Sequence, residues 1–206
     1  MRKQPKTKKR VYDPEGTRQR IVSVAAEQFQ RHGYNATSMH DIMQRAGVPG
    51  GSMYYHFPTK KSLGLAVIRE AVARSIEDTW IAPVRAATSA REGVVSVFKA
   101  VANQIERDGR GVSGCPLNNL TIELSLADKH FQSALRQVFD AWTAALANRI
   151  AQDIHDRKLR GIDPSETALA IVASFSGAMA LAKASQSTAA IETCARYIPD
   201  LFEPHR

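Results

Sequence analysis

Apolar residues recur at intervals of three and four along the whole chain, and no stretch alternates strictly between apolar and polar positions. In residues 17–32, for example, Ile21, Ala25 and Phe29 fall on one stripe of a helix. Gly33 follows as a helix stop. Because alternation is the pattern of half-buried strands, this periodicity predicts an all-α fold. The predicted helices cover about residues 17–32, 38–46, 49–57, 60–82 (ending at Pro83), 89–108, 116–126, 128–158, 164–185 and 188–202.

Two short helices near residue 50 are joined by a glycine-containing turn. Ser38 and Asp41 have the spacing of a capping box, in which a hydroxyl and a carboxylate bind the free amides of a helix N-terminus. Gly47 supplies the positive φ that ends this helix. Pro49 opens the next helix, at a position where its missing N–H is not needed. With the preceding helix, the pair predicts a three-helix unit that contains a helix-turn-helix.

The second helix of the pair carries polar rings on its surface. Met53 and Phe57 are four residues apart and are expected to face the core. Tyr54, Tyr55 and His56 lie between them and cannot all point inward. Hydroxyl and imidazole donors on a helix surface suit the phosphate oxygens of DNA. The pattern therefore favours a DNA-binding helix.

Two glycines, Gly50 and Gly51, open the same helix. A glycine inside a helix is less favourable than alanine by about 1 kcal/mol, so a close approach by another molecule would explain the pair. Free backbone amides at a helix N-terminus bind phosphate well. The alternative interpretation is that the glycines and the neighbouring rings only pack the turn.

Positive charge is concentrated at the N-terminal end. The chain carries a net charge of +8, and residues 1–60 hold eleven Lys and Arg against four Asp and Glu. Phosphate neutralisation requires such an asymmetry, and DNA affinity should then fall steeply with salt. Residues 1–10 contain six Lys and Arg and no acid. This segment is either a solvated disordered tail or an arm that adds backbone or minor-groove contacts.

The run of residues 37–63 resembles the DNA-binding domain of the tetracycline-repressor (TetR) family of bacterial transcription regulators. The matching residues are Ala46-Gly47-Val48, Gly51-Ser52, Tyr54-Tyr55-His56-Phe57, Thr59-Lys60 and Leu63. The resemblance implies that phosphates are contacted by Tyr54, Tyr55, His56 and Lys60, and by Thr37 or Ser38. It implies that Gly50, Gly51 and Ser52 lie nearest the base edges. Position 50 departs from the family pattern, in which a long polar side chain is frequent.

Small and apolar residues on the last two predicted helices suggest an interface between two copies. Small side chains allow close helix approach, and two such helix pairs form a four-helix bundle. The residues are Ser174, Gly177, Ala178, Leu181, Ile191, Ala195 and Ile198. Ordinary packing within one chain is the alternative, whereas the family resemblance favours the dimer. A two-fold dimer would select a pseudo-palindromic site on double-stranded DNA.

Cys115 stands at the start of the helix predicted over 116–126, where the helix dipole favours a thiolate. Asn118 and Asn119 follow it. The stretch resembles the entry to the ligand domain of a TetR subgroup that responds to small, often electrophilic or oxidising compounds. Cys115 is therefore either a reactive sensor or a packed or pocket-lining thiol. Further candidates for lining an effector pocket are Phe98, Ile105, Phe139, Trp142 and Phe175.

No sequence motif supports catalysis, a metal or a cofactor. The Gly-x-Gly-x-x-Gly pattern of residues 109–114 follows a predicted helix rather than a strand, so it is expected to be a loop. The six histidines and two cysteines lack zinc spacing, and neither a P-loop nor a Gly-x-Ser-x-Gly elbow occurs. No signal peptide is expected, and the apolar stretch 170–182 is interrupted by serines and too short to span a membrane. These observations predict a cytoplasmic protein that is not an enzyme.

The sequence thus predicts a basic tail (1–13), a helix-turn-helix domain (14–62) and an effector-binding and dimerisation domain (63–206). The predicted function is that of a ligand-responsive repressor, which binds a pseudo-palindromic operator as a homodimer and is released by a small-molecule effector. The helix that starts at Lys60 is shared by both domains and would couple them. Two alternatives remain: a redox or electrophile switch through Cys115, and a constitutive DNA-binding protein without an effector.

Overall fold

The computed structural model describes residues 13–204, and every regular element in this range is helical. This confirms the predicted all-α fold. Most of the basic segment falls on residues 1–12, outside the described residues. The elements are α1 (Pro14–His32), α2 (Met39–Ala46), α3 (Gly50–His56), α4 (Lys60–Ala66), η1 (Val67–Val72), α5 (Ala73–Ile76), η2 (Glu77–Ile81), α6 (Ala82–Ala86), α7 (Ala90–Asp108), α8 (Pro116–Leu124), α9 (Lys129–His155), α10 (Pro164–Ser185), α11 (Ala189–Tyr197) and η3 (Ile198–Phe202).

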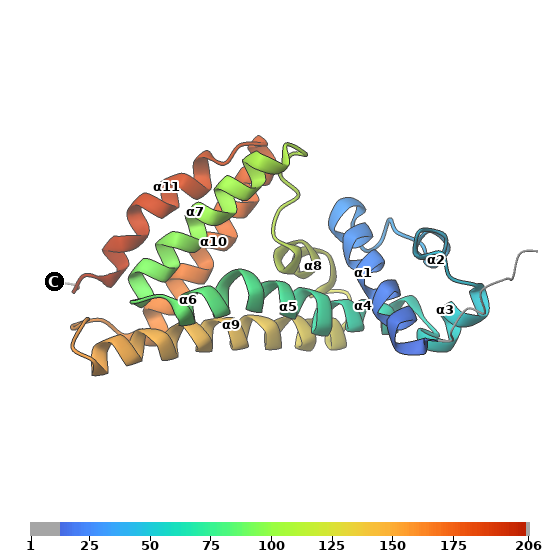
Figure 1. The fold of residues 1–206 in the computed structure, drawn as a ribbon, viewed down its shortest axis with the longest axis horizontal. Coiled ribbons are helices and arrows are strands. Elements are labelled where there is room, and N and C mark those ends of the chain that lie inside the picture. Colours follow the sequence, from blue (N-terminus) through green and yellow to red (C-terminus); the bar gives the residue numbers. More distant parts are fainter. Residues whose placement is uncertain (1–12, 205–206) are drawn as a thin grey trace, which may run out of the picture.

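Helices α1, α2 and α3 form a small head at one end of the molecule (Figure 1). The capping box of α2 is present: the Ser38 hydroxyl accepts from the Asp41 amide at 3.1 Å, and the Ser38 amide donates to the Asp41 carboxylate. Gly47 ends α2 with a φ of 60°. Helix α1 begins earlier than predicted because the Asp13 carboxylate caps it, accepting from the Gly16 amide at 2.9 Å. Asp13 therefore belongs to the head rather than to the tail.

A continuous helical rod runs from α4 through η1, α5 and η2 to α6, and connects the head to the rest of the molecule (Figure 1). The prediction that it ends at Pro83 was wrong, because helix continues to Ala86. Pro83 lies in the first turn of α6, directly after the π-helical segment η2. The wider π turn changes the i−4 geometry that normally excludes proline from a helix interior.

The remaining helices pack with this rod into a larger body. Helix α9 lies along the rod, while α7, α10 and α11 cross above it (Figure 1). At the centre, the Trp80 ring lies 4.8 Å from Phe175 and 5.1 Å from Trp142, centroid to centroid. Phe98 completes the cluster, 5.5 Å from Trp80 in a T-shaped arrangement. Such aromatic contacts stabilise a core beyond the area that they bury.

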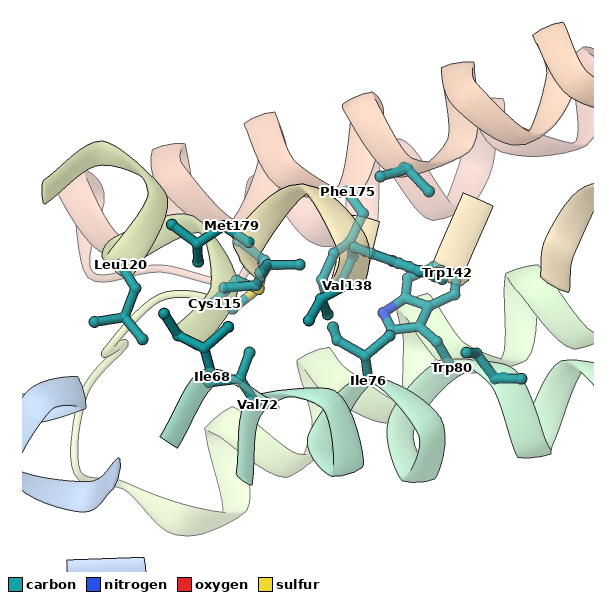
Figure 2. Packing of buried hydrophobic residues seen from close by; sticks show 14 of the residues in the cluster. Ile68, Val72, Ile76, Trp80, Cys115, Leu120, Val138, Trp142, Phe175 and Met179 are labelled. Atoms are coloured by element: carbon teal, nitrogen blue, oxygen red, sulfur yellow. The ribbon is translucent and has the colours of Figure 1, made fainter. Parts of the chain in front are cut away.

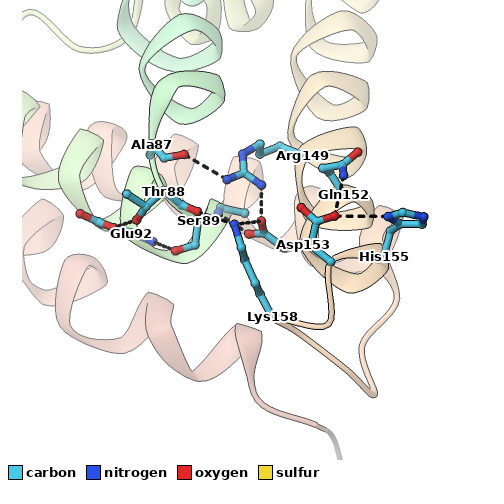
Figure 3. A network of polar contacts seen from close by, with 11 residues as sticks. Ala87, Thr88, Ser89, Glu92, Arg149, Gln152, Asp153, His155 and Lys158 are labelled. Carbon is cyan, nitrogen blue, oxygen red and sulfur yellow. Dashed lines mark hydrogen bonds and ion pairs between the residues drawn. The ribbon is translucent and has the colours of Figure 1, made fainter.

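A buried carboxylate ties α7 to the end of α9 (Figure 3). Asp153 is fully buried, accepts from the Ala90 amide at 2.6 Å and pairs with Arg149. The Arg149 guanidinium also donates to the Ala87 carbonyl at 3.0 Å. Removing one partner of a buried ion pair is destabilising by about 3–5 kcal/mol, so this contact fixes the far end of the body.

Helix α10 is longer than the apolar stretch that the sequence indicated. With 22 residues, it is the one helix among the described residues that is long and apolar enough to cross a membrane, by length and composition alone. The expectation that it is too short was therefore wrong. One face of α10 packs on α9 and α11, which accounts for much of its apolar character.

Candidate DNA-binding surface and effector cavity

Helix α3 holds two aromatic rings out toward solvent. Met53 is fully buried and Phe57 is 3% exposed, so these two residues fix the helix to the head. Tyr54 and Tyr55 are 55% and 73% exposed. His56 is half-buried and packs edge-on against Tyr55 at 5.1 Å. The structure thus brings together three of the predicted phosphate-binding side chains on one short helix.

The start of α3 leaves room for a close approach. A Cβ added at Gly51 would meet no atom within 4 Å, and one at Gly50 would make only an ordinary contact with Met43. Neither glycine is therefore required by packing inside the chain. Ser52, the third predicted base-edge residue, is half-buried.

The two candidate phosphate contacts at the start of α2 differ in burial. Thr37 is 3% exposed, and its hydroxyl donates to the Gly33 carbonyl at 2.8 Å. The prediction of Thr37 as a surface contact is therefore corrected: its hydroxyl holds the turn between α1 and α2. Ser38 is exposed beside it.

Lys60 differs from the other predicted phosphate contacts because the chain itself binds its ammonium group. Lys60 Nζ donates to the Asn35 carbonyl at 3.2 Å and lies 4.4 Å from the centre of the Tyr34 ring. Burial lowers the pKa of Lys60, and the nearby Glu123 carboxylate partly opposes that shift. In this structure Lys60 therefore lies at the contact between the head and the body.

Several polar contacts between the head, the rod and the rest of the body were not predicted, including those of Gln30 on α1 with the Gly114 carbonyl and the Asn119 amide. Arg18 on α1 donates to both oxygens of Glu70 on η1, at 2.7 and 2.5 Å, and this bond lowers the pKa of Glu70. Lys61 donates to Asp128 at 2.5 Å. Glu123 on α8 accepts from two backbone amides of the head. Their partners are 52 to 89 residues apart, so no local pattern pointed to them.

A cavity of about 450 Å³ lies in the body between the rod, α7 and the start of α8. Its apolar wall is made by Ile76, Trp80, Pro83, Val97, Val101, Ile105, Pro116, Phe175 and Met179. Polar groups are fewer and include Ser75, Asp78, Thr79 and Gln104. This volume and lining are typical of a site for a small, mainly apolar organic molecule.

Three of the eight candidate effector residues, Ile105, Cys115 and Phe175, line this cavity. Cys115 lies beside Met179 (Figure 2). Phe98 and Trp142 are fully buried behind the cavity wall. Asn118 donates to the Ser176 carbonyl at 3.1 Å and Asn119 to the Ser113 carbonyl at 2.9 Å. These two amides hold α8 in place, which corrects their assignment as ligand contacts.

Of the two alternatives for Cys115, its burial favours the packed or pocket-lining thiol over a reactive sensor. Cys115 does stand at the N-terminus of α8 and is 4% exposed. Burial raises the pKa of its thiol, although backbone amides of Asn118 and Leu117 oppose the shift. The desolvation of a thiolate therefore outweighs the helix dipole at this position.

The predicted dimer residues divide between core and surface. Ala178, Ile191, Ala195 and Ile198 are buried within the chain, so they are corrected to core residues. Ser174 is half-buried, whereas Gly177 and Leu181 are exposed. The exposed apolar face of α10 and α11 also includes residues that the sequence analysis missed: Leu169, Ala173, Ala180, Ala184 and Tyr197. A helical wheel of α10 shows this second apolar stripe, so the sequence alone could have predicted it.

Family comparisons agree with this architecture. Residues 21–67 match the model for bacterial regulatory proteins of the tetR family. Residues 90–197, more than half of the chain, match the transcriptional regulator LmrA/YxaF-like C-terminal domain. The chain belongs to the TetR family of bacterial transcriptional regulators. Within that family its body is of the LmrA/YxaF-like type.

Individual relatives span nearly the same length. The HTH-type transcriptional regulator LmrA of Bacillus subtilis is 26% identical over 196 residues, covering 91% of this chain and 97% of its own. The HTH-type transcriptional repressor DhaR of a Mycobacterium species is 27% identical over 170 residues, covering 79% and 80%. A solved TetR regulator from Chloroflexus aurantiacus superposes with a TM-score of 0.79 at 25% identity, covering 91% and 94%.

No group of three or more His, Cys, Asp or Glu side chains suited to a metal ion occurs among residues 13–204. The polar clusters in this range instead cap helices and join the head to the body, as described above.

Proposed function

We propose that this regulator represses transcription by binding a pseudo-palindromic operator as a homodimer, and that a small molecule in the body cavity releases it. The observation that carries the DNA-binding part is the exposed pair Tyr54 and Tyr55 on a helix anchored by buried Met53 and Phe57. The relative DhaR is a transcriptional repressor, which supports the direction of regulation. Binding to bacterial DNA places this work in the cytoplasm, and it requires no catalytic step.

The proposed domain division follows the two surfaces. Residues 14–62, with the cap residue Asp13, form the DNA-binding head and residues 63–206 the effector-binding and dimerisation body, with the basic segment 1–12 as an additional arm. On the head we assign phosphate contacts to Ser38, Tyr54, Tyr55 and His56. The backbone at Gly50, Gly51 and Ser52 then lies nearest the base edges. Lys60 joins the phosphate contacts only if it leaves the Asn35 carbonyl.

The proposed dimer interface is the exposed apolar face of α10 and α11. Leu169 and Leu181 are 61% and 64% exposed, and Tyr197 is 66% exposed. A Cβ added at Gly177 would meet no atom within 4 Å in the part of the chain that the structure describes, so a second helix has room to approach there. Two copies of α10 and α11 would bury this face as a four-helix bundle.

The test is a selection of bound fragments from genomic DNA of the source organism, followed by footprinting of the best fragment. We expect a protected pseudo-palindrome with one half-site for each protomer. Raising salt from 50 to 200 mM should weaken binding by about two orders of magnitude or more, as for several phosphate contacts. Uniform binding to all fragments would instead support an architectural protein without an operator.

A further inference from the structure

Helix α8 extends from the effector cavity to the DNA-binding head. Its nine residues span about 13 Å. At its start, Cys115 and Pro116 line the cavity. At its other end, Glu123 contacts the head, and in Figure 1 α8 lies between α10 and α1. Leu117, Leu120 and Leu124 are buried along one side, so α8 moves as a unit if it moves at all.

Glu123 binds the turn that connects α1 to α2. Its two carboxylate oxygens accept from the Tyr34 amide at 2.8 Å and from the Asn35 amide at 2.5 Å. Bonds from backbone amides to a carboxylate are among the stronger hydrogen bonds in proteins. A Cβ added at Gly33, where φ is +86°, would lie 3.3 Å from the carboxylate. The glycine therefore allows the side chain from α8 to approach this turn.

The same turn is held from a second side by a cation. Lys60 at the start of the rod donates to the Asn35 carbonyl and covers the Tyr34 ring. The turn leads directly to Ser38, which caps α2. The position of α2 and α3 in the head thus depends on a turn whose amides are bound by α8 and whose carbonyl is bound by the rod.

We propose that Glu123 is the positioning residue through which the cavity controls the DNA-binding head. An occupant that displaces α8 at Cys115 and Pro116 moves the Glu123 carboxylate, and the carboxylate carries the turn at Tyr34 and Asn35 with it. This inference rests on the proposed function, because it names the route by which an effector would act. Its first test requires neither operator nor effector.

The first experiment measures hydrogen exchange at the amides of Tyr34 and Asn35 in the free protein. In Glu123→Ala both amides lose their acceptor, and exchange should accelerate about tenfold or more. Glu123→Gln keeps one oxygen acceptor and should fall between Glu123→Ala and wild type. The matched control is Glu70→Gln, which weakens a different contact between head and body by removing its charge and one acceptor oxygen, and should leave these two amides protected.

The second experiment fills the cavity end of α8 with Cys115→Phe, or with the smaller Cys115→Leu if the first variant does not fold. Filling should accelerate exchange of the same two amides in wild type and in Glu70→Gln, but should add nothing in Glu123→Ala. A filling effect of equal size in Glu123→Ala would overturn the proposal, and so would unchanged exchange on removal of the carboxylate.

Binding to the selected operator gives the functional readout. Cys115→Phe should change affinity by the same factor in wild type and Glu70→Gln, and by less than about twofold in Glu123→Ala, since coupled sites are non-additive. If the protein had no specific DNA site, the exchange experiment would still decide the coupling. Failure of the proposed function and failure of this inference are therefore distinguishable.

Discussion

The head and the body of this regulator are built from contacts of different range. In the head, the capping box of Ser38 and Asp41 and the rings of Tyr54 and Tyr55 depend on residues within a few positions of one another. In the body, one cavity is lined by residues from Ser75 to Met179. The head therefore has a binding surface that is specified by short segments. The body has a pocket that forms only when helices distant in sequence pack together.

Because of this difference, contacts between the head and the body must carry any effect of a ligand to the DNA-binding surface. A ligand inside the body touches none of the exposed residues of α3, so its effect must pass through contacts such as Glu123 with the Tyr34 amide. Energetic coupling between two sites requires an element that responds to both. Helix α8 meets both sites in this structure.

The largest expected effect separates the stability of the body from that of the DNA-binding surface. Trp142 is fully buried and its indole nitrogen has no hydrogen-bond partner, so Trp142→Ala removes packing alone. The free energy of unfolding should fall by about 3–5 kcal/mol, as measured by urea denaturation followed by circular dichroism. Tyr55→Ala, at an exposed site, should stay within about 0.5 kcal/mol of wild type. Equal losses would contradict the assignment of Tyr55 to a free surface.

The next effect concerns the apolar face of α10. Leu181→Asp places a charge on the proposed dimer interface and should convert dimers to monomers in sedimentation measurements at micromolar concentration. The matched control is Leu126→Asp, because Leu126 is 97% exposed and lies outside α10 and α11. If dimers persisted in Leu181→Asp, or dissociated only in Leu126→Asp, the dimer interface would have to lie on another surface.

Gly51→Ala sharpens the contrast between packing and DNA binding. A methyl group at this position meets nothing within 4 Å among residues 13–204, and alanine favours helix by about 1 kcal/mol over glycine. Stability should therefore rise slightly while operator affinity falls, because the methyl group occupies the space next to the base edges. The two quantities come from thermal unfolding and from fluorescence anisotropy. Unchanged affinity would place the DNA away from the start of α3.

The thiol of Cys115 should be slow to react. Burial raises its pKa above the ordinary value of 9.0, so little thiolate exists at neutral pH. Mass spectrometry after iodoacetamide treatment at pH 7.5 should show Cys194, which is half-buried, modified before Cys115. Faster modification of Cys115 would revive the electrophile switch that the sequence left open.

The smallest expected effect is a pH dependence of stability that arises from the ion pair between Arg18 and Glu70. The bond with Arg18 lowers the pKa of Glu70 below its ordinary value of 4.5, so the stabilisation is present above that pH. It is lost as pH falls below 4.5 toward the lowered pKa. Because both side chains are about one-third exposed, the loss should be under about 1 kcal/mol. Urea denaturation at pH 6 and pH 3.5 should show a smaller pH-dependent loss in Glu70→Gln than in wild type.

Sequence-based prediction was more accurate for the head than for the body. The helix start at Ser38 and the helix stop at Gly47 were predicted because capping depends on local residue types. The buried positions of Met53 and Phe57 followed from helical spacing. In the body, Asn118 and Asn119 were assigned to a ligand, although tertiary contacts bind their amides to backbone carbonyls.

Burial also reversed two inferences that were correct for an exposed helix. A helix N-terminus lowers the pKa of a thiol, but Cys115 is buried and its pKa is raised. A stripe of small residues favours helix association, but Ala178 packs in the core of the chain, whereas Leu169 is exposed. In both cases the local pattern was identified, and the neighbours that decide its role came from elsewhere in the sequence.

The central claim is that the exposed face of α3 binds DNA phosphates. The most direct measurement compares operator affinity of wild type, Tyr55→Phe and Tyr55→Ala over a range of salt concentrations. The account predicts that both variants, which lack the hydroxyl, bind more weakly, Tyr55→Ala more so, and that the slope of log affinity against log salt stays negative and steep. Wild-type affinity in Tyr55→Ala, with unchanged salt dependence, would contradict it.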